Sequence, residues 1–171
     1  MPKPKVALLV GSDSDIPTMR EGIEVLKKLQ ISYELHIYSA HRTPDQTLRF
    51  AQKAHEQGFR VIIAGAGMAA HLAGVVASHT LLPVIGVPIE GKLQGLDSLL
   101  STVQMPKGVP VGTVAIGKTG AVNAALLAAQ ILALSDEELL KRIGAYRFSM
   151  GQEVLNKDKE LQGNARKFFK N

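Results

Sequence analysis

The sequence predicts an α/β fold in which a parallel β-sheet lies between layers of helices. Short apolar runs of strand length alternate with longer stretches in which apolar residues recur every three or four positions, as on one face of a helix. This alternation continues along the chain and is typical of parallel sheets. The length of 171 residues favours one domain with a sizeable core, so residues 1–171 are predicted to form a single domain.

Five segments have the composition of strands. The first, Val6–Val10, is apolar throughout, as expected of a strand covered on both faces. The second, Tyr33–Tyr38, alternates polar and apolar residues, which indicates an edge strand with one wetter face. The others are Arg60–Ala64, Val84–Val87, closed by Pro88, and Gly112–Ile116. A second strand at the edge favours the order 2-1-3-4-5 of a flavodoxin-like three-layer sandwich.

Helices are expected between these strands and after the last one. Thr43 and Pro44 suit the N-cap and first position of the second helix, which should run to Gln57 and stop at Gly58. The other helices are expected from about Ile16, from His71 to Ser78, from Asp97 to Val103, from Ala121 to Leu134 and, as a C-terminal helix, from Asp136. The tail after Gly151 is polar and charged, with Phe168 and Phe169 near its end.

Composition narrows the classes of function. The 20 basic and 15 acidic residues give a net charge of +5 without a Lys/Arg run, and only 5% of residues are aromatic, so no nucleic-acid partner is expected. The absence of cysteine excludes disulfides, thiolate catalysis and cysteine-based metal sites. The apolar run Val6–Val10 is too short for a signal segment, and no stretch reads as a membrane span. We therefore expect a soluble, cytoplasmic protein without membrane partners.

The loop Gly11–Asp15 joins the first strand to the first helix, where backbone N–H groups can hold a phosphate. It is not a Walker A loop, because no Gly-Lys-Ser/Thr follows. Two carboxylates would repel a phosphate, so at least one is expected to do other work, such as binding ribose hydroxyls. The alternative is that Ser14 or Asp15 only caps the helix.

The hexapeptide Ser39–Pro44 follows the second strand and combines a proton-transfer group with a permanent cation. His41 titrates near neutral pH and is the candidate acid and base. Arg42 offers a planar fork for a phosphate or carboxylate, and Ser39 adds a hydroxyl. The alternative for Arg42 is a surface ion pair with Asp45.

The loop Gly65–His71 is rich in small residues, which let a ligand approach the backbone closely. It lacks a GxGxxG motif, so a Rossmann cofactor is weakly supported. His71 either donates to a ligand or satisfies carbonyls of its own loop, and we favour the second. The remaining histidines, His36, His55 and His79, are expected to be structural or on the surface, and none has a metal-ligand spacing, so no metal site is predicted.

Several motifs together resemble the PurE family of purine biosynthesis. They are Gly11–Asp15, Ser39–Pro44, Gly65–Gly67, Ala69–Leu72, Asp97–Ser101 and Val103–Pro106, and the likeness covers about residues 5 to 155. The resemblance implies a flavodoxin-like fold and a homo-octamer. Within the family the chain is similar to the first class, which moves a carboxylate from the exocyclic nitrogen of N5-carboxyaminoimidazole ribonucleotide to ring carbon C4, without ATP, metal, biotin or another cofactor.

The resemblance also implies roles for individual residues. His41 matches the family's catalytic histidine, Ser12, Asp15 and Arg42 match its ribose-phosphate ligands, and Ser39 and Gly11 lie in the same pocket. The loop that lines the imidazole and carboxylate contributes Gly67, Ala69, Ala70, His71 and Leu72. Three departures concern the loops: Met68 stands where the family commonly has Gly, Ala73 where it commonly has Pro, and Ile89–Gly95 is one residue shorter than usual.

Two alternatives remain beside the mutase. The family's second class carboxylates aminoimidazole ribonucleotide directly with carbon dioxide, but usually has Lys at the position of Arg42 and a different loop at 67–70. A non-catalytic nucleotide- or flavin-binding module on the same fold is the other alternative, and it leaves His41 without a role. For assembly, we expect the segment 151–171 to cross onto a neighbouring subunit of the octamer.

Overall fold

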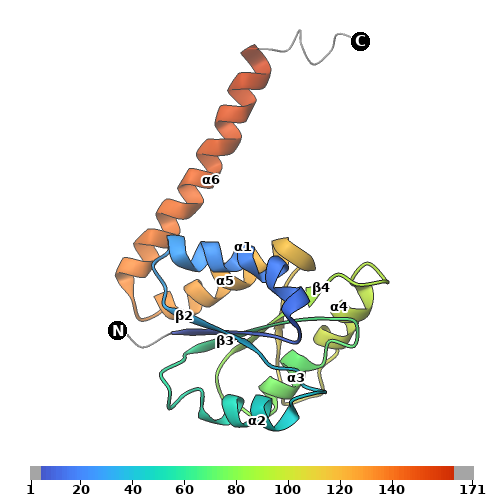
Figure 1. The fold of residues 1–171 in the computed structure, drawn as a ribbon. Helices are drawn as coiled ribbons and strands as arrows, with labels where there is room; N and C mark the ends of the chain where they lie inside the picture. The colour runs from blue at the N-terminus through green and yellow to red at the C-terminus, as the bar shows by residue number, and fades with distance from the viewer. Residues whose placement is uncertain (1–4, 164–171) are drawn as a thin grey trace.

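The computed structural model of the protein describes residues 5–163. A central parallel sheet forms the middle layer of the molecule (Figure 1). The strands lie in the order β2-β1-β3-β4-β5, so the predicted fold class and strand order are confirmed. Their bounds are β1 Val6–Val10, β2 Tyr33–Ile37, β3 Val61–Gly67, β4 Val84–Ile89 and β5 Gly112–Thr113.

Helices cover both faces of the sheet (Figure 1). They are the short 3-10 helix η1 Asp13–Asp15, α1 Ile16–Lys28, α2 Pro44–Lys53, α3 Leu72–Ala77, α4 Leu96–Val103, α5 Gly117–Ala133 and α6 Glu137–Gly163. The central strand β1 supplies both cores, because successive side chains point to opposite faces. Leu8 and Val10 pack in the core beneath α1 and α5, whereas Ala7 and Leu9 pack in the core above α2 and α3.

Several predicted boundaries were wrong. Strand β4 continues through Pro88 to Ile89, because β5 pairs only as far as Gly86 and the missing N–H of Pro88 deprives no neighbouring strand. Strand β5 is two residues long rather than five. Helix α2 stops at Lys53, and Gly58, with φ of +91°, ends the turns that follow it.

The C-terminal helix begins as predicted after Asp136, whose Oδ1 accepts a hydrogen bond of 2.9 Å from the N–H of Leu139. Within α6 only Leu139 and Ile143 are buried, and the rest of the helix projects away from the sheet (Figure 1). The projecting part bears Phe148, Met150, Val154, Leu155 and Leu161 as exposed apolar side chains. Phe168 and Phe169 of the predicted tail lie outside the described residues. No helix within residues 5–163 is both long and apolar enough to cross a membrane.

Candidate active site

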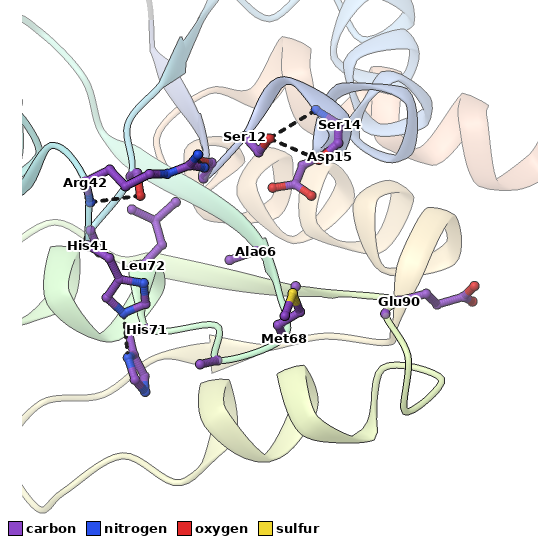
Figure 2. Close-up of a pocket in the computed structure, with 16 residues that line it drawn as sticks. Ser12, Ser14, Asp15, His41, Arg42, Ala66, Met68, His71, Leu72 and Glu90 are labelled. Atoms are coloured by element: carbon purple, nitrogen blue, oxygen red, sulfur yellow. Dashed lines mark hydrogen bonds between the residues drawn. The ribbon is translucent and has the colours of Figure 1, made fainter.

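A cleft of about 580 Å³ opens at the carboxyl edge of the sheet, where the loops after β1, β2, β3 and β4 meet. Figure 2 shows its side chains. The predicted site residues that line it are Gly11, Ser12, Asp15, Ser39, His41, Arg42, Gly67, Ala69, His71 and Leu72. Three segments that lie far apart in the sequence therefore converge as the parallel topology requires.

In the first loop Ser12 is the N-cap of η1, and its Oγ accepts from the N–H of Ser14 at 3.4 Å. The Oδ1 of Asp13 accepts from the same N–H at 3.0 Å. Asp15 occupies the N-cap position of α1 but makes no side-chain capping bond, so the alternative in which Ser14 or Asp15 only caps the helix is wrong. The carboxylate of Asp15 points into the cleft (Figure 2). Burial raises the pKa of Asp15 above its usual value, against the opposing effects of a backbone hydrogen bond from Ser12 and the charge of Arg42.

The second loop is fixed by its own hydroxyl groups. The hydroxyl of Thr43 donates to the carbonyl of Ser39 at 3.1 Å and accepts from the N–H of Ser39 at 2.9 Å, so it closes this loop. Thr43 occupies the N-cap position of α2 as predicted, but its side chain makes no capping bond there. Ser39 Oγ accepts from the N–H of Arg42 at 3.1 Å. The Nη2 of Arg42 reaches the carbonyl of Gly11 at 3.3 Å, and among the described residues Arg42 forms no ion pair with Asp45. Arg42 therefore bridges the first two loops.

The second and third loops meet in a pair of histidines. Nε2 of His41 lies 2.8 Å from Nδ1 of His71, and the two rings meet edge to face with their planes at 85°. The favoured prediction that His71 satisfies carbonyls of its own loop was wrong. Because one nitrogen of such a pair must carry the proton and the other a lone pair, the contact fixes the orientation of the His41 ring.

The third loop supplies small side chains to the opposite wall. Ala70 is 1% exposed and does not line the cleft, contrary to its predicted place among the binding residues. Met68 lines it with φ of +56°, a left-handed conformation that favours glycine.

Sequence reasoning missed part of the cleft. Ser14 lines it although we considered it only as a cap, and Glu90 and Gly91 line it from the loop after β4. The usable signal was topological, because β4 is a central strand whose carboxyl end must reach the same edge of the sheet. Within the described residues, no three His, Asp or Glu side chains gather closely enough to hold a metal ion.

Comparison with known proteins shows the family to which the chain belongs. The family model described as AIR carboxylase matches residues 5–153. The chain belongs to the AIR carboxylase family. The Escherichia coli K12 member is 54% identical over 152 residues, 88% of this chain and 90% of its own, and is named N5-carboxyaminoimidazole ribonucleotide mutase. The Pyrococcus horikoshii member of the same name is 53% identical over 161 residues, 94% of this chain and 90% of its own.

The family fold is also seen in a solved structure. The crystal structure of Treponema denticola PurE superimposes with a TM-score of 0.82 at 29% identity, covering 92% of this chain and 98% of that one. The resemblance to the PurE family that the motifs predicted is therefore confirmed.

Proposed function

We propose that this AIR carboxylase family member is a mutase of de novo purine biosynthesis. It converts N5-carboxyaminoimidazole ribonucleotide into 4-carboxy-5-aminoimidazole ribonucleotide, and the reaction is reversible. The observation that carries the proposal is the position of His41, which lies in the cleft with Nε2 bonded to His71 and with Arg42 and Asp15 beside it. The names of relatives that are 52% to 56% identical support the same reaction.

The first two loops are the proposed binding site for the ribose-phosphate end. The guanidinium of Arg42 and the hydroxyls of Ser12 and Ser39 suit the phosphate. The carboxylate of Asp15 would repel a phosphate, so we assign it to a ribose hydroxyl, from which it accepts a hydrogen bond. The backbone of Gly11 and the small residues of the third loop then leave the imidazole and its carboxylate beside His41.

Proton transfer by His41 divides the reaction into two steps. Protonated His41 donates to the exocyclic nitrogen of the carbamate, the nitrogen–carbon bond breaks, and carbon dioxide and the neutral amine form. Carbon C4 of the electron-rich ring then attacks carbon dioxide, and the C4 proton returns to the neutral His41. The numbers of protons and electrons balance, so the chemistry needs no external acid, oxidant or cofactor.

The contact with His71 suits both steps. Nδ1 of His41 has no hydrogen-bond partner among the described residues, so it is the nitrogen available for exchange with the substrate. Nε2 can donate to Nδ1 of His71 throughout, which keeps one tautomer of His41 in place while Nδ1 gives and then takes the proton. His71 is in this account a positioning residue. The apolar side chain of Leu72 and the small Ala66 and Ala69 line the part of the cleft where carbon dioxide would be held.

The remaining parts of the proposal concern the whole protein. Residues 1–171 act as one catalytic domain that needs no metal or cofactor, in a homo-octamer to which the segment 151–171 contributes contacts with a neighbour. The exposed apolar side chains of α6 support this contact. The charge of a phosphorylated substrate, which does not cross membranes unaided, supports a place in the cytoplasm.

The substitution His41→Asn tests the assignment of the proton carrier. Wild-type protein should convert N5-carboxyaminoimidazole ribonucleotide without ATP in a spectroscopic assay. His41→Asn should lower turnover by about 10²- to 10⁴-fold, the usual contribution of general acid–base catalysis, while ligand binding stays largely intact. Near-full activity of the variant would show that another group moves the proton.

A further inference from the structure

The loop Glu90–Gly95 forms the rim of the cleft between β4 and α4, and its two ends are held by one buried residue. Ser98 is 0% exposed, and its Oγ lies 2.8 Å from the carbonyl of Ile89 and 2.9 Å from that of Gly95. Both ends of the loop are thus fastened to the first turn of α4. Between them, residues 90–94 are exposed. The loop is fixed at its base and exposed at its tip.

Asp97, next to Ser98, lies beneath this loop with an unused acceptor. Its Oδ1 is buried and has no hydrogen-bond partner within residues 5–163. Its Oδ2 lies against Gly91, 3.9 Å from the place where a Cβ would stand. A buried carboxylate oxygen without a donor is costly, at about 1–3 kcal/mol or more, so structures seldom keep one without a reason.

The loop itself carries the matching donors. The N–H of Gln94 bonds to the carbonyl of Gly91 at 3.0 Å, but the N–H groups of Gly91, Lys92 and Leu93 have no partner among the described residues. Gln94 has φ of +56°, which a non-glycine residue seldom adopts. Free donors therefore lie on the loop, and a free acceptor lies beneath it.

The loop also contacts the opposite lip of the cleft. A Cβ on Gly91 would stand 3.5 Å from Cγ of Met68 and 3.9 Å from its backbone nitrogen. Both residues line the cleft. A small movement of the loop toward Asp97 would therefore shift Gly91 relative to Met68 and change the shape of the cleft rim.

We propose that Asp97 is a positioning residue that holds the loop Glu90–Gly95 closed over the bound ribonucleotide, with Oδ1 accepting a hydrogen bond from an N–H of the loop. This inference rests on the proposed function, because the closed loop retains the carbon dioxide that exists between decarboxylation and attack by C4. Closure of a loop over a reactive intermediate keeps water out and the intermediate in.

Isotope exchange tests this role directly. Wild type and Asp97→Ala are supplied with N5-carboxyaminoimidazole ribonucleotide in ¹³C-bicarbonate, and the label in the product is measured per turnover. Asp97→Ala should incorporate several-fold more label, because carbon dioxide escapes and is replaced, and its kcat/KM should fall about 10-fold. Asp97→Asn keeps one acceptor oxygen and should restore part of both values.

Asp136→Ala is the matched control, since Asp136 also serves the first turn of a helix but lies at the base of α6. It should lose some stability with the lost helix cap and incorporate no more label than wild type. Cleavage by trypsin after Lys92 reports on the loop in the wild type and should slow several-fold when the product ribonucleotide is bound.

Three results would overturn the inference. Label incorporation and kcat/KM that are the same in Asp97→Ala and wild type would do so, and so would cleavage at Lys92 that bound product does not slow. In both cases wild-type turnover would leave the proposed function standing. A wild type that fails to convert the substrate would remove the proposed function and this inference with it.

Discussion

Nε2 of His41 and Nδ1 of His71 lie 2.8 Å apart, although thirty positions separate the two residues in the sequence. One belongs to the loop after β2 and the other to the N-cap position of α3, so the contact joins two loops across the carboxyl edge of the sheet. The orientation of the proposed proton carrier therefore depends on a side chain from another segment.

We expect His71→Ala to lower kcat by about 10- to 100-fold and to leave KM nearly unchanged. Without the partner, the ring of His41 can rotate and change tautomer, and a misplacement of about 1 Å can cost about 100-fold in rate. Steady-state kinetics across pH 5–9 measure the effect. His55→Ala, which removes an exposed histidine that follows α2 and does not line the cleft, is the control and should behave as wild type. A loss confined to KM would show that His71 binds substrate instead.

The ionised carboxylate of Asp15 should lower the stability of the fold near neutral pH. Burial raises the pKa of Asp15, so the folded protein binds this proton more tightly than the unfolded chain does. The contribution of Asp15 to the free energy of unfolding therefore falls as pH rises from the ordinary aspartate pKa through the raised one. Asp15→Asn should unfold at a higher temperature than wild type at pH 7, and the difference should vanish near pH 3.

The same substitution should raise KM by about 10- to 100-fold, the worth of one charged hydrogen bond. Thermal unfolding at the two pH values and steady-state kinetics check both statements. Asp45→Asn, at an exposed position of α2, should not raise the unfolding temperature. A less stable Asp15→Asn at pH 7 would contradict the account of burial.

Close contact between α1 and α5 should depend on Gly22. A Cβ at this position would stand 2.5 Å from the carbonyl oxygen of Ala121, which is backbone and cannot rotate away. Gly22→Ala should therefore lower the free energy of unfolding by about 1–3 kcal/mol, measured by urea denaturation. Gly144→Ala in α6 meets nothing within 4 Å and should raise it by about 0.5–1 kcal/mol. Equal effects of the two substitutions would contradict the packing argument.

Assembly should depend on the apolar side of α6. Leu155, which is 53% exposed, follows Phe148 at a spacing of two helical turns, whereas its neighbour Asn156 falls on the polar side. Leu155→Asp should dissociate the proposed octamer at micromolar concentration in light scattering. Asn156→Asp adds the same charge and should leave the mass unchanged. A wild type with the mass of a single chain would refute the octamer itself.

The sequence was sufficient for the arrangement of the sheet, because continuous and alternating apolar runs report how many faces of a strand are covered. The sequence did not show where the pairing between neighbouring strands ends. Nothing local shows that β5 stops at Thr113, and this early stop is what allows Pro88 to remain within β4. The start of α5 was missed for a similar reason, since Gly117–Gly120 looks like a turn until the packed helix includes it.

For the site, the loops after β1, β2 and β3 were found because they bring acidic, basic, hydroxyl and small residues together after predicted strands. Ala70 was misplaced because the direction of a small side chain depends on the turn at Met68, which no pattern of residues specifies. The contact between His41 and His71 was missed because it depends on tertiary distance. Residue type identifies candidates, and only the fold decides which of them touch.

The most direct test of the central claim compares two substrates on the same wild-type protein. N5-carboxyaminoimidazole ribonucleotide without ATP, and aminoimidazole ribonucleotide with modest bicarbonate, are followed side by side for formation of 4-carboxy-5-aminoimidazole ribonucleotide. We expect rapid turnover of the first substrate and little of the second. Rapid turnover of aminoimidazole ribonucleotide with bicarbonate, and none of the carbamate, would contradict the mutase and make the protein a direct carboxylase.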